Sequence, residues 1–147
     1  MKFSIANYVR RSRSSFYYPM LILPREKREA IMTIYAFCRF TDDIADRAAS
    51  DPSYNAVEFL KHWSDEVRLA IDSVSCYPLL NQVISVARRC MIPFGLFFEL
   101  IGGIEMDLIK NRYGTFDELY AYCYKVASTV GLMTLRVGNM KFKDINL

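Results

Sequence analysis

Apolar side chains recur every three or four residues along almost the whole chain after about residue 20. This is the spacing of one face of an α-helix, because successive residues turn by about 100° around the helix axis. No stretch alternates apolar and polar residues convincingly, as a half-buried β-strand does. The pattern therefore predicts an all-α fold, a bundle of helices around a shared core. The stretch 54–74 shows the spacing on one predicted helix face, with Val57, Leu60, Trp63, Val67, Ala70 and Ile71.

Proline marks the limits of the first long helix. Pro24 favours a helix start, because proline costs nothing in a first turn. We expect this helix to run to Ala49, since Ser50-Asp51-Pro52 then interrupts it.

Later helices are separated in the same way. Pro78 and Pro93 divide two further predicted helices, and Gly102-Gly103 should weaken the second of them. The last helix has a T-x-x-E capping box, in which Thr115 and Glu118 would each accept from the other's backbone N–H. It is apolar almost all round, which predicts a position inside the bundle.

Composition is that of an ordinary globular protein. The chain has 147 residues, of which 52% are hydrophobic and 24% charged, and a chain of this size buries roughly 70% of its unfolded surface. We therefore expect one helical domain, 1–147. The four cysteines include no C-x-x-C pair, which argues against a zinc site and favours the reducing cytoplasm. No signal peptide or membrane-spanning stretch is predicted.

Basic residues crowd the start of the chain, although the net charge is only +3. They include Lys2, Arg10, Arg11 and Arg13. Such a segment is either a solvated end or one that meets phosphates or an anionic membrane surface. Peripheral membrane contact is therefore one prediction, and no nucleic-acid partner is expected.

Three aspartates lie within five residues, in Asp42-Asp43-Ile44-Ala45-Asp46 near the end of the first long helix. Asp42 and Asp46 stand about 40° apart around the helix and one turn apart along it, so they share a face. The same face continues backward through Arg39 and Tyr35. Two carboxylates, a guanidinium and a phenol are thus predicted to form one stripe.

Carboxylates this close repel one another, by up to about 4 kcal/mol for a pair at about 4 Å. A divalent cation removes that repulsion, and all-oxygen ligands favour magnesium, manganese or calcium. Arg39 adds a fork of donors that suits a phosphate group. The alternative is an exposed acidic helix end whose aspartates cap or pair with Arg47. Acids near a helix C-terminus oppose the helix dipole, so local stability does not account for them.

Several ordered blocks resemble the squalene/phytoene synthase family. The first comprises Phe16-Tyr17-Tyr18, Leu23-Pro24, Tyr35-Ala36-Phe37-Cys38-Arg39 and the three aspartates. A second, over 100–108, 113–119 and 122–131, is similar to the central helices of the family. The resemblance runs from Ser12 to Gly138. The Ser-Ser-Phe-Tyr-Tyr, Glu-Met-Asp-Leu and Val-Ala-Ser stretches are most similar to bacterial presqualene diphosphate synthases of hopanoid pathways, with phytoene synthase a near neighbour.

The resemblance implies roles for particular residues. Asp42 and Asp46 would bind magnesium with support from Asp43, while Arg39 and Tyr35 would contact diphosphate. The catalytic set would therefore be Asp42, Asp46, Arg39 and Tyr35. A flap over the phosphates would comprise Ser12, Arg13, Ser14 and Ser15. The walls of a prenyl tunnel would come from Phe16, Tyr122, Val126, Ala127, Val130 and Gly131, whose composition equally suits a plain core face.

The same resemblance implies a helical bundle of the class I isoprenoid synthase type and a prenyltransferase reaction that needs magnesium, or manganese in its place. Two farnesyl diphosphates would join head to head to presqualene diphosphate, or, in the phytoene branch, two geranylgeranyl diphosphates would join. One diphosphate departs, and the double bond of the second substrate attacks the allylic cation. A dry apolar tunnel would protect that cation from water. The motifs do not address a reductive step with NADPH.

Members of the family carry a second aspartate-rich helix, and no second D-x-x-x-D occurs in this sequence. We therefore expect the N-terminal portion of the fold, with half of the metal cluster and weak binding of a magnesium–diphosphate assembly. An apolar face left exposed would be covered by self-association or by a partner chain.

Three other interpretations remain. The chain could be a non-catalytic helical subunit that needs a partner for the second metal site. It could be a head-to-tail prenyl synthase or a terpene cyclase, although the Tyr-Ala-Phe-Cys-Arg lead-in argues against both. A ferritin-like di-iron bundle is disfavoured, because no E-x-x-H pair occurs.

Overall fold

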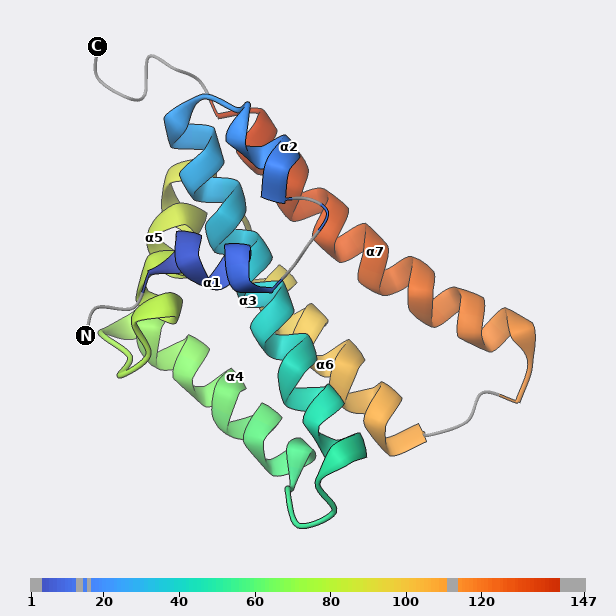
Figure 1. Ribbon diagram of the computed structural model, residues 1–147. Coiled ribbons are helices and arrows are strands. Elements are labelled where there is room, and N and C mark those ends of the chain that lie inside the picture. Colours follow the sequence, from blue (N-terminus) through green and yellow to red (C-terminus); the bar gives the residue numbers. More distant parts are fainter. Residues whose placement is uncertain (1–3, 13–14, 16, 111–113, 141–147) are drawn as a thin grey trace.

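The computed structural model describes residues 4–12, 15, 17–110 and 114–140. This part of the chain forms seven α-helices and no strand, which confirms the all-α prediction. None of the helices in these ranges is long and apolar enough to cross a membrane. Helix α3 is central and packs against all the others (Figure 1). The helices are α1 (Ile5–Arg11), α2 (Tyr17–Leu21), α3 (Arg25–Ser50), α4 (Ala56–Asp72), α5 (Pro78–Cys90), α6 (Gly95–Lys110) and α7 (Phe116–Gly138).

Helix α3 begins and ends close to the predicted limits. Pro24 is its N-cap residue, and Glu26 stands in the first turn, where an acid faces the positive end of the helix dipole. The helix ends at Ser50, and the N–H of Asp51 donates to the carbonyl of Arg47 at 3.1 Å. The signals for these limits are local, which is why the sequence alone identified them.

Helix α6 forms as predicted and continues without a break through Gly102-Gly103, the pair expected to weaken it. Gly103 is buried where α6 passes α7, and a Cβ added there would lie 3.6 Å from the Val126 side chain. Packing against α7 thus offsets the weak helix propensity of glycine.

An aromatic cluster joins α3, α4 and α6 at the centre of the core. The Trp63 ring stacks on Phe40 with 4.7 Å between centroids and on Phe37 at 6.2 Å. Phe37 in turn meets Phe97 edge-on at 5.1 Å. The Trp63 Nε1–H donates to the Thr41 hydroxyl at 3.1 Å, which satisfies the one polar group of the buried indole. This cluster fixes the turn of α3 that precedes the aspartates.

Helix α7 lies at the edge of the bundle, so its predicted position inside the bundle is wrong. Thr129, Met133 and Val137 are buried against the other helices. On another side, Phe116, Tyr120 and Tyr124 are exposed, and their rings stack at 6.4 and 6.2 Å between successive centroids. We call these three residues the aromatic ladder. Apolar residues on all sides of a helix do not indicate which side packs against other helices. In the described part of the chain, only one side of α7 does so.

The start of α7 confirms half of the predicted capping box. The Thr115 hydroxyl accepts from the N–H of Glu118 at 3.2 Å. The Glu118 carboxylate, however, accepts from the N–H of Gly114 at 2.9 Å, one residue earlier than the motif predicts.

Candidate functional site

An apolar cavity of about 380 Å³ lies between α2, α3 and α7, and Asp42 stands in its wall. Helix α3 supplies most of the lining, because its residues 31, 34, 35, 38 and 42 recur at intervals of three and four and therefore share one face. Met20 of α2 adds to the wall, as do Val130 and Thr134 of α7. Tyr35 and Asp42, which the sequence placed on one stripe, therefore face the same cavity.

The carboxyl group of Asp42 is electrostatically strained. Partial burial, with the negative charge of Asp46 one turn away, raises its pKa from 3.8 to about 6, although Arg39 opposes the shift. The neighbouring thiol of Cys38 has a pKa raised to about 12 by burial and by the charge of Asp42. Asp42 and Asp46 thus form an acidic pair that a cation would stabilise.

Asp43 and Arg39 are engaged with each other rather than with the cavity. The Arg39 Nε atom lies 3.3 Å from Asp43 Oδ1. The Tyr8 hydroxyl of α1 donates to Asp43 Oδ2 at 3.1 Å, and burial together with this carboxylate raises the pKa of Tyr8. Asp43 therefore ties α1 to α3 beside the acidic pair, and Arg39 would reach a diphosphate only by leaving this ion pair.

Asp107 is a residue of the site that the sequence did not assign. Burial and the charges of Asp107 and Asp42 raise the pKa of Tyr122 to about 12. Tyr122 of α7 is therefore close enough to Asp107 of α6 and to Asp42 of α3 to interact electrostatically with both. The Glu-Met-Asp-Leu stretch that contributed to the resemblance contains Asp107, so a signal for this residue was present.

The other residues predicted for the site lie at the end of α1, just after it, and along α7. Ser12 ends α1, where its hydroxyl donates to the Val9 carbonyl at 2.6 Å, and Ser15 is exposed. On α7, Val126 is half-buried and Val130 lines the cavity, whereas Ala127 and Gly131 are exposed. Arg13, Ser14 and Phe16 lie outside the described residues.

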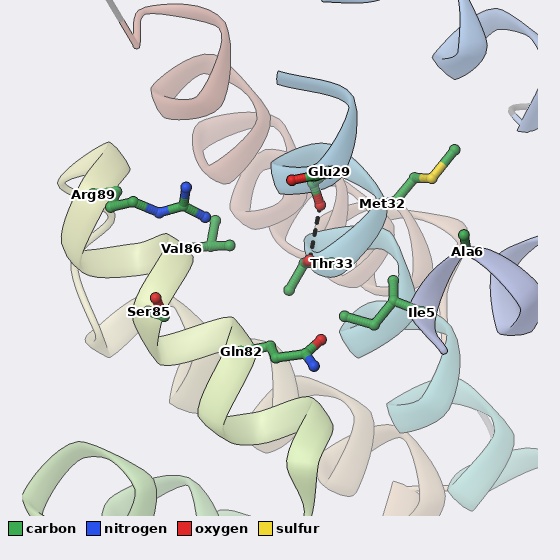
Figure 2. A pocket seen from close by; sticks show the side chains of 9 residues that line it. All are labelled: Ile5, Ala6, Glu29, Met32, Thr33, Gln82, Ser85, Val86 and Arg89. Atoms are coloured by element: carbon green, nitrogen blue, oxygen red, sulfur yellow. Dashed lines mark hydrogen bonds between the residues drawn. The ribbon is translucent and has the colours of Figure 1, made fainter. Parts of the chain in front are cut away.

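A second cavity, of about 290 Å³, lies on the opposite side of α3, between α1, α3 and α5 (Figure 2). Its charged side chains and one of its hydroxyl groups already have partners. The Thr33 hydroxyl donates to the Glu29 carbonyl at 2.8 Å, the Glu29 carboxylate pairs with Arg25 at 3.1 Å, and Arg89 lies 3.5 Å from Glu26. Because the charged side chains of this cavity, Glu29 and Arg89, are both in ion pairs, the cavity beside Asp42 is the better candidate for chemistry.

The acidic pair fits the donor set that magnesium or manganese prefers. Carboxylate oxygens are hard ligands, and burial and the charge of Asp46 disfavour the ionised form of Asp42, which a bound cation would stabilise. Among the described residues, no three His, Cys, Asp or Glu side chains gather closely enough to hold a metal ion by themselves. Asp42 and Asp46 would therefore supply two ligands, and the substrate or other groups would complete the coordination.

The shifted pKa of Asp42 predicts how stability depends on pH. Because the carboxyl group binds its proton more tightly in the folded chain, its ionisation lowers the free energy of unfolding as the pH rises from about 4 to about 6. One side of Asp42 is open to solvent, so we expect a decrease of only about 1 kcal/mol or less. Urea unfolding of wild type and Asp42→Asn across this range would measure it, as the difference between the two curves. A constant difference from pH 4 to about 7 would contradict the assignment.

Comparisons with known proteins give consistent results. A family model described as squalene/phytoene synthase matches residues 9–144. Phytoene synthase from Arthrospira platensis is 36% identical over 133 residues, which is 90% of this chain and 42% of that protein. The 15-cis-phytoene synthase of Synechococcus elongatus is 36% identical over 131 residues, and the chloroplastic phytoene synthase of Narcissus pseudonarcissus is 38% identical over 125. These matches cover 82% and 84% of this chain but 38% and 29% of those two proteins. The chain thus spans about two fifths or less of the length of these relatives.

Proposed function

This chain belongs to the squalene/phytoene synthase family, and from that premise we propose that it provides the first acidic half of a site that condenses two prenyl diphosphates head to head. The observation that carries the proposal is the position of Asp42 in the wall of an apolar cavity of about 380 Å³, with Asp46 one turn away. An acidic pair beside an apolar cavity suits a ligand with a metal-bound polar head and a hydrocarbon tail.

We propose that Asp42 and Asp46 hold magnesium, with manganese as a substitute. When bound, the metal supplies positive charge that neutralises the diphosphate. Residues of the chain would position the substrate. Tyr35 lines the same cavity as Asp42, and Arg39, one turn before Asp43, would donate hydrogen bonds to phosphate oxygens. Burial and the charges of Asp107 and Asp42 raise the pKa of Tyr122 to about 12, so this phenol stays protonated near neutral pH.

The proposed reaction needs no nucleophilic side chain, because the double bond of the second substrate is the nucleophile. The allylic carbon–oxygen bond of one substrate breaks, and its electron pair leaves with the diphosphate. The double bond of the second substrate then gives its electron pair to the allylic carbon, and loss of a proton closes a cyclopropane ring. The apolar wall, formed by residues such as Ile31, Ile34 and Val130, excludes water that would otherwise trap the cation.

Two prenyl diphosphates are candidate substrates. The curated relatives named above are phytoene synthases, which favours geranylgeranyl diphosphate. The local motifs around residues 14–18 and 105–108 favour farnesyl diphosphate as the substrate and presqualene diphosphate as the product.

The test is to incubate the chain with magnesium and each labelled prenyl diphosphate separately, and to resolve the products by mass. We expect a cyclopropyl diphosphate or its onward product, with release of one diphosphate per condensation, from one of the two substrates. Calorimetry with an unreactive thiolodiphosphate analogue measures binding independently of turnover. Absence of both product and magnesium-dependent binding for both substrates would reject the proposal.

A second candidate function is that of a helical subunit whose partner completes the site. The exposed aromatic ladder favours it, because three stacked rings in water are a surface that another helix would cover. In that case the analogue binds weakly to the chain alone, and product forms only after the partner, or a second copy, is present.

A further inference from the structure

Four elements meet at one end of the molecule, the end at which α3 begins. The Lys27 Nζ donates to the Gly138 carbonyl of α7 at 2.8 Å, and Arg28 reaches the Leu21 carbonyl of α2 at 3.5 Å. On α5, Arg89 lies 3.5 Å from Glu26 of α3, and Cys90 Sγ lies 3.7 Å from Met140 Sδ, just beyond α7. In Figure 1 the start of α3, helix α2 and the end of α7 accordingly gather at the top of the view. We call this region the basic end.

Large apolar side chains protrude from the basic end. Ile22, in the turn between α2 and α3, is 86% exposed, and Tyr18 of α2 is 75% exposed. Leu21 and Leu23, which flank Ile22, are also exposed. We call Tyr18, Leu21, Ile22 and Leu23 the apolar tip. Four large apolar side chains exposed within six residues of the chain indicate an interaction surface, whereas a single exposed apolar residue would not.

Basic side chains lie at the same end of the molecule as this apolar tip. Arg25, Lys27 and Arg28 lie in the first turn of α3, Arg89 in the last turn of α5 and Arg136 in the last turn of α7. The acids described here are Glu26 and Glu29, and each lies in an ion pair, with Arg89 and Arg25 respectively. Arg88, in the same turn as Arg89, instead reaches α4, where it donates to the Ile71 carbonyl at 2.8 Å. Among the described residues, the other five basic side chains against two acidic ones leave a net charge of +3 on this end. An apolar tip inside a basic collar is complementary to a surface that is anionic outside and apolar beneath.

Helix α2 connects this surface with the cavity. Met20 is buried and lines the cavity beside Asp42, while Tyr18 and Leu21 of the same short helix face water. A lipid-soluble ligand that left a bilayer at the basic end would therefore need to pass only α2 to reach the apolar part of the cavity.

We propose that the basic end docks on the surface of an anionic lipid bilayer, with Ile22 and its neighbours inserted among the acyl chains and the basic collar at the headgroups. The docking does not depend on the proposed reaction, because it requires neither magnesium nor a prenyl diphosphate.

The test is co-sedimentation of the full chain with vesicles of phosphatidylcholine alone and with vesicles that also contain phosphatidylglycerol, in the absence of prenyl substrate. We expect binding to the anionic vesicles only, and we expect Ile22→Asp to weaken it roughly tenfold or more, because the apolar contact is lost. Arg136→Gln should weaken it by roughly fivefold, and about 1 M salt should remove most of it.

The matched control is Ile109→Asp. Ile109 is 66% exposed in the last turn of α6, which in Figure 1 lies at the other end of the molecule from α2. This variant should bind vesicles like wild type, and thermal unfolding should show that both isoleucine variants keep the native fold. Equal loss in the two variants, or binding to neutral vesicles alone, would overturn the proposal. So would a wild-type dimer that Ile22→Asp converts to a monomer while no vesicle binding is seen, because the tip would then be covered by a second copy.

Discussion

Replacing Asp42 by asparagine is expected to weaken magnesium-dependent binding of inorganic pyrophosphate by roughly a hundredfold or more, because even outer-shell groups of metal sites are worth roughly ten- to a hundredfold. The substitution preserves the shape of the side chain and removes the charge that the metal would neutralise. It also removes the repulsion with Asp46 that contributes to the raised pKa of Asp42. Isothermal titration calorimetry at fixed pH, with and without magnesium, measures the effect.

The controls separate metal binding from folding. Asp46→Asn should cause a loss of similar size, whereas Asp72→Asn, an exposed aspartate at the end of α4, should cause none. Helix content by circular dichroism should stay nearly unchanged in all three variants, because Asp42 and Asp46 are exposed. If both Asp42→Asn and Asp46→Asn bind pyrophosphate and magnesium like wild type, the metal role is wrong.

Replacing Trp63 by alanine is expected to lower the free energy of unfolding by about 3–5 kcal/mol. Trp63 is fully buried, stacks on Phe37 and Phe40, and meets Tyr77 edge-on at 5.2 Å. Its Nε1–H also donates to Thr41, the residue immediately before Asp42. The substitution therefore opens a cavity behind the turn of α3 that carries the acidic pair. Urea unfolding followed by circular dichroism measures the change.

Trp63→Phe distinguishes the contribution of aromatic stacking from that of the indole hydrogen bond. It keeps an aromatic side chain but leaves the Thr41 hydroxyl, which still donates to the Phe37 carbonyl at 2.7 Å, without its indole donor. We expect this variant to lose about 1–2 kcal/mol. Lys61→Ala, two residues away and exposed on the same helix, should change stability by less than about 0.5 kcal/mol. A loss of under about 1 kcal/mol in Trp63→Ala would show that the cluster is not the anchor of α3.

Much of the fold could be predicted from local signals. Pro24 and the Ser50-Asp51-Pro52 interruption set the limits of α3 to within a residue, because caps and breakers act on their own backbone. Thr115 likewise identified the start of α7. The contact between Gly103 and α7 could not be predicted, since it is a property of packing between two helices.

The candidate site was predicted less completely. The helical spacing correctly placed Tyr35 and Asp42 on one face of α3, and the cavity confirms that they share it. Helical spacing also places Arg39 and Asp43 one turn apart, where opposite charges pair. It could not reveal that Asp43 also accepts from Tyr8, which is 35 residues earlier in the chain. Asp107 was missed for a related reason: its proximity to Tyr122 and Asp42 results from the path of three different helices.

The sequence by itself determined that this chain is helical, where its main helices begin and end, and that one turn of α3 presents adjacent carboxylates. Those features depend on the period of the helix and on residues within one or two turns of each other. Only the tertiary structure decided which carboxylate faces an apolar cavity, which one accepts a hydrogen bond from Tyr8 of α1, and that α7 leaves its aromatic ladder in water. These outcomes depend on which helix faces come together, because burial and contacts between helices are set by neighbours that are distant in the chain.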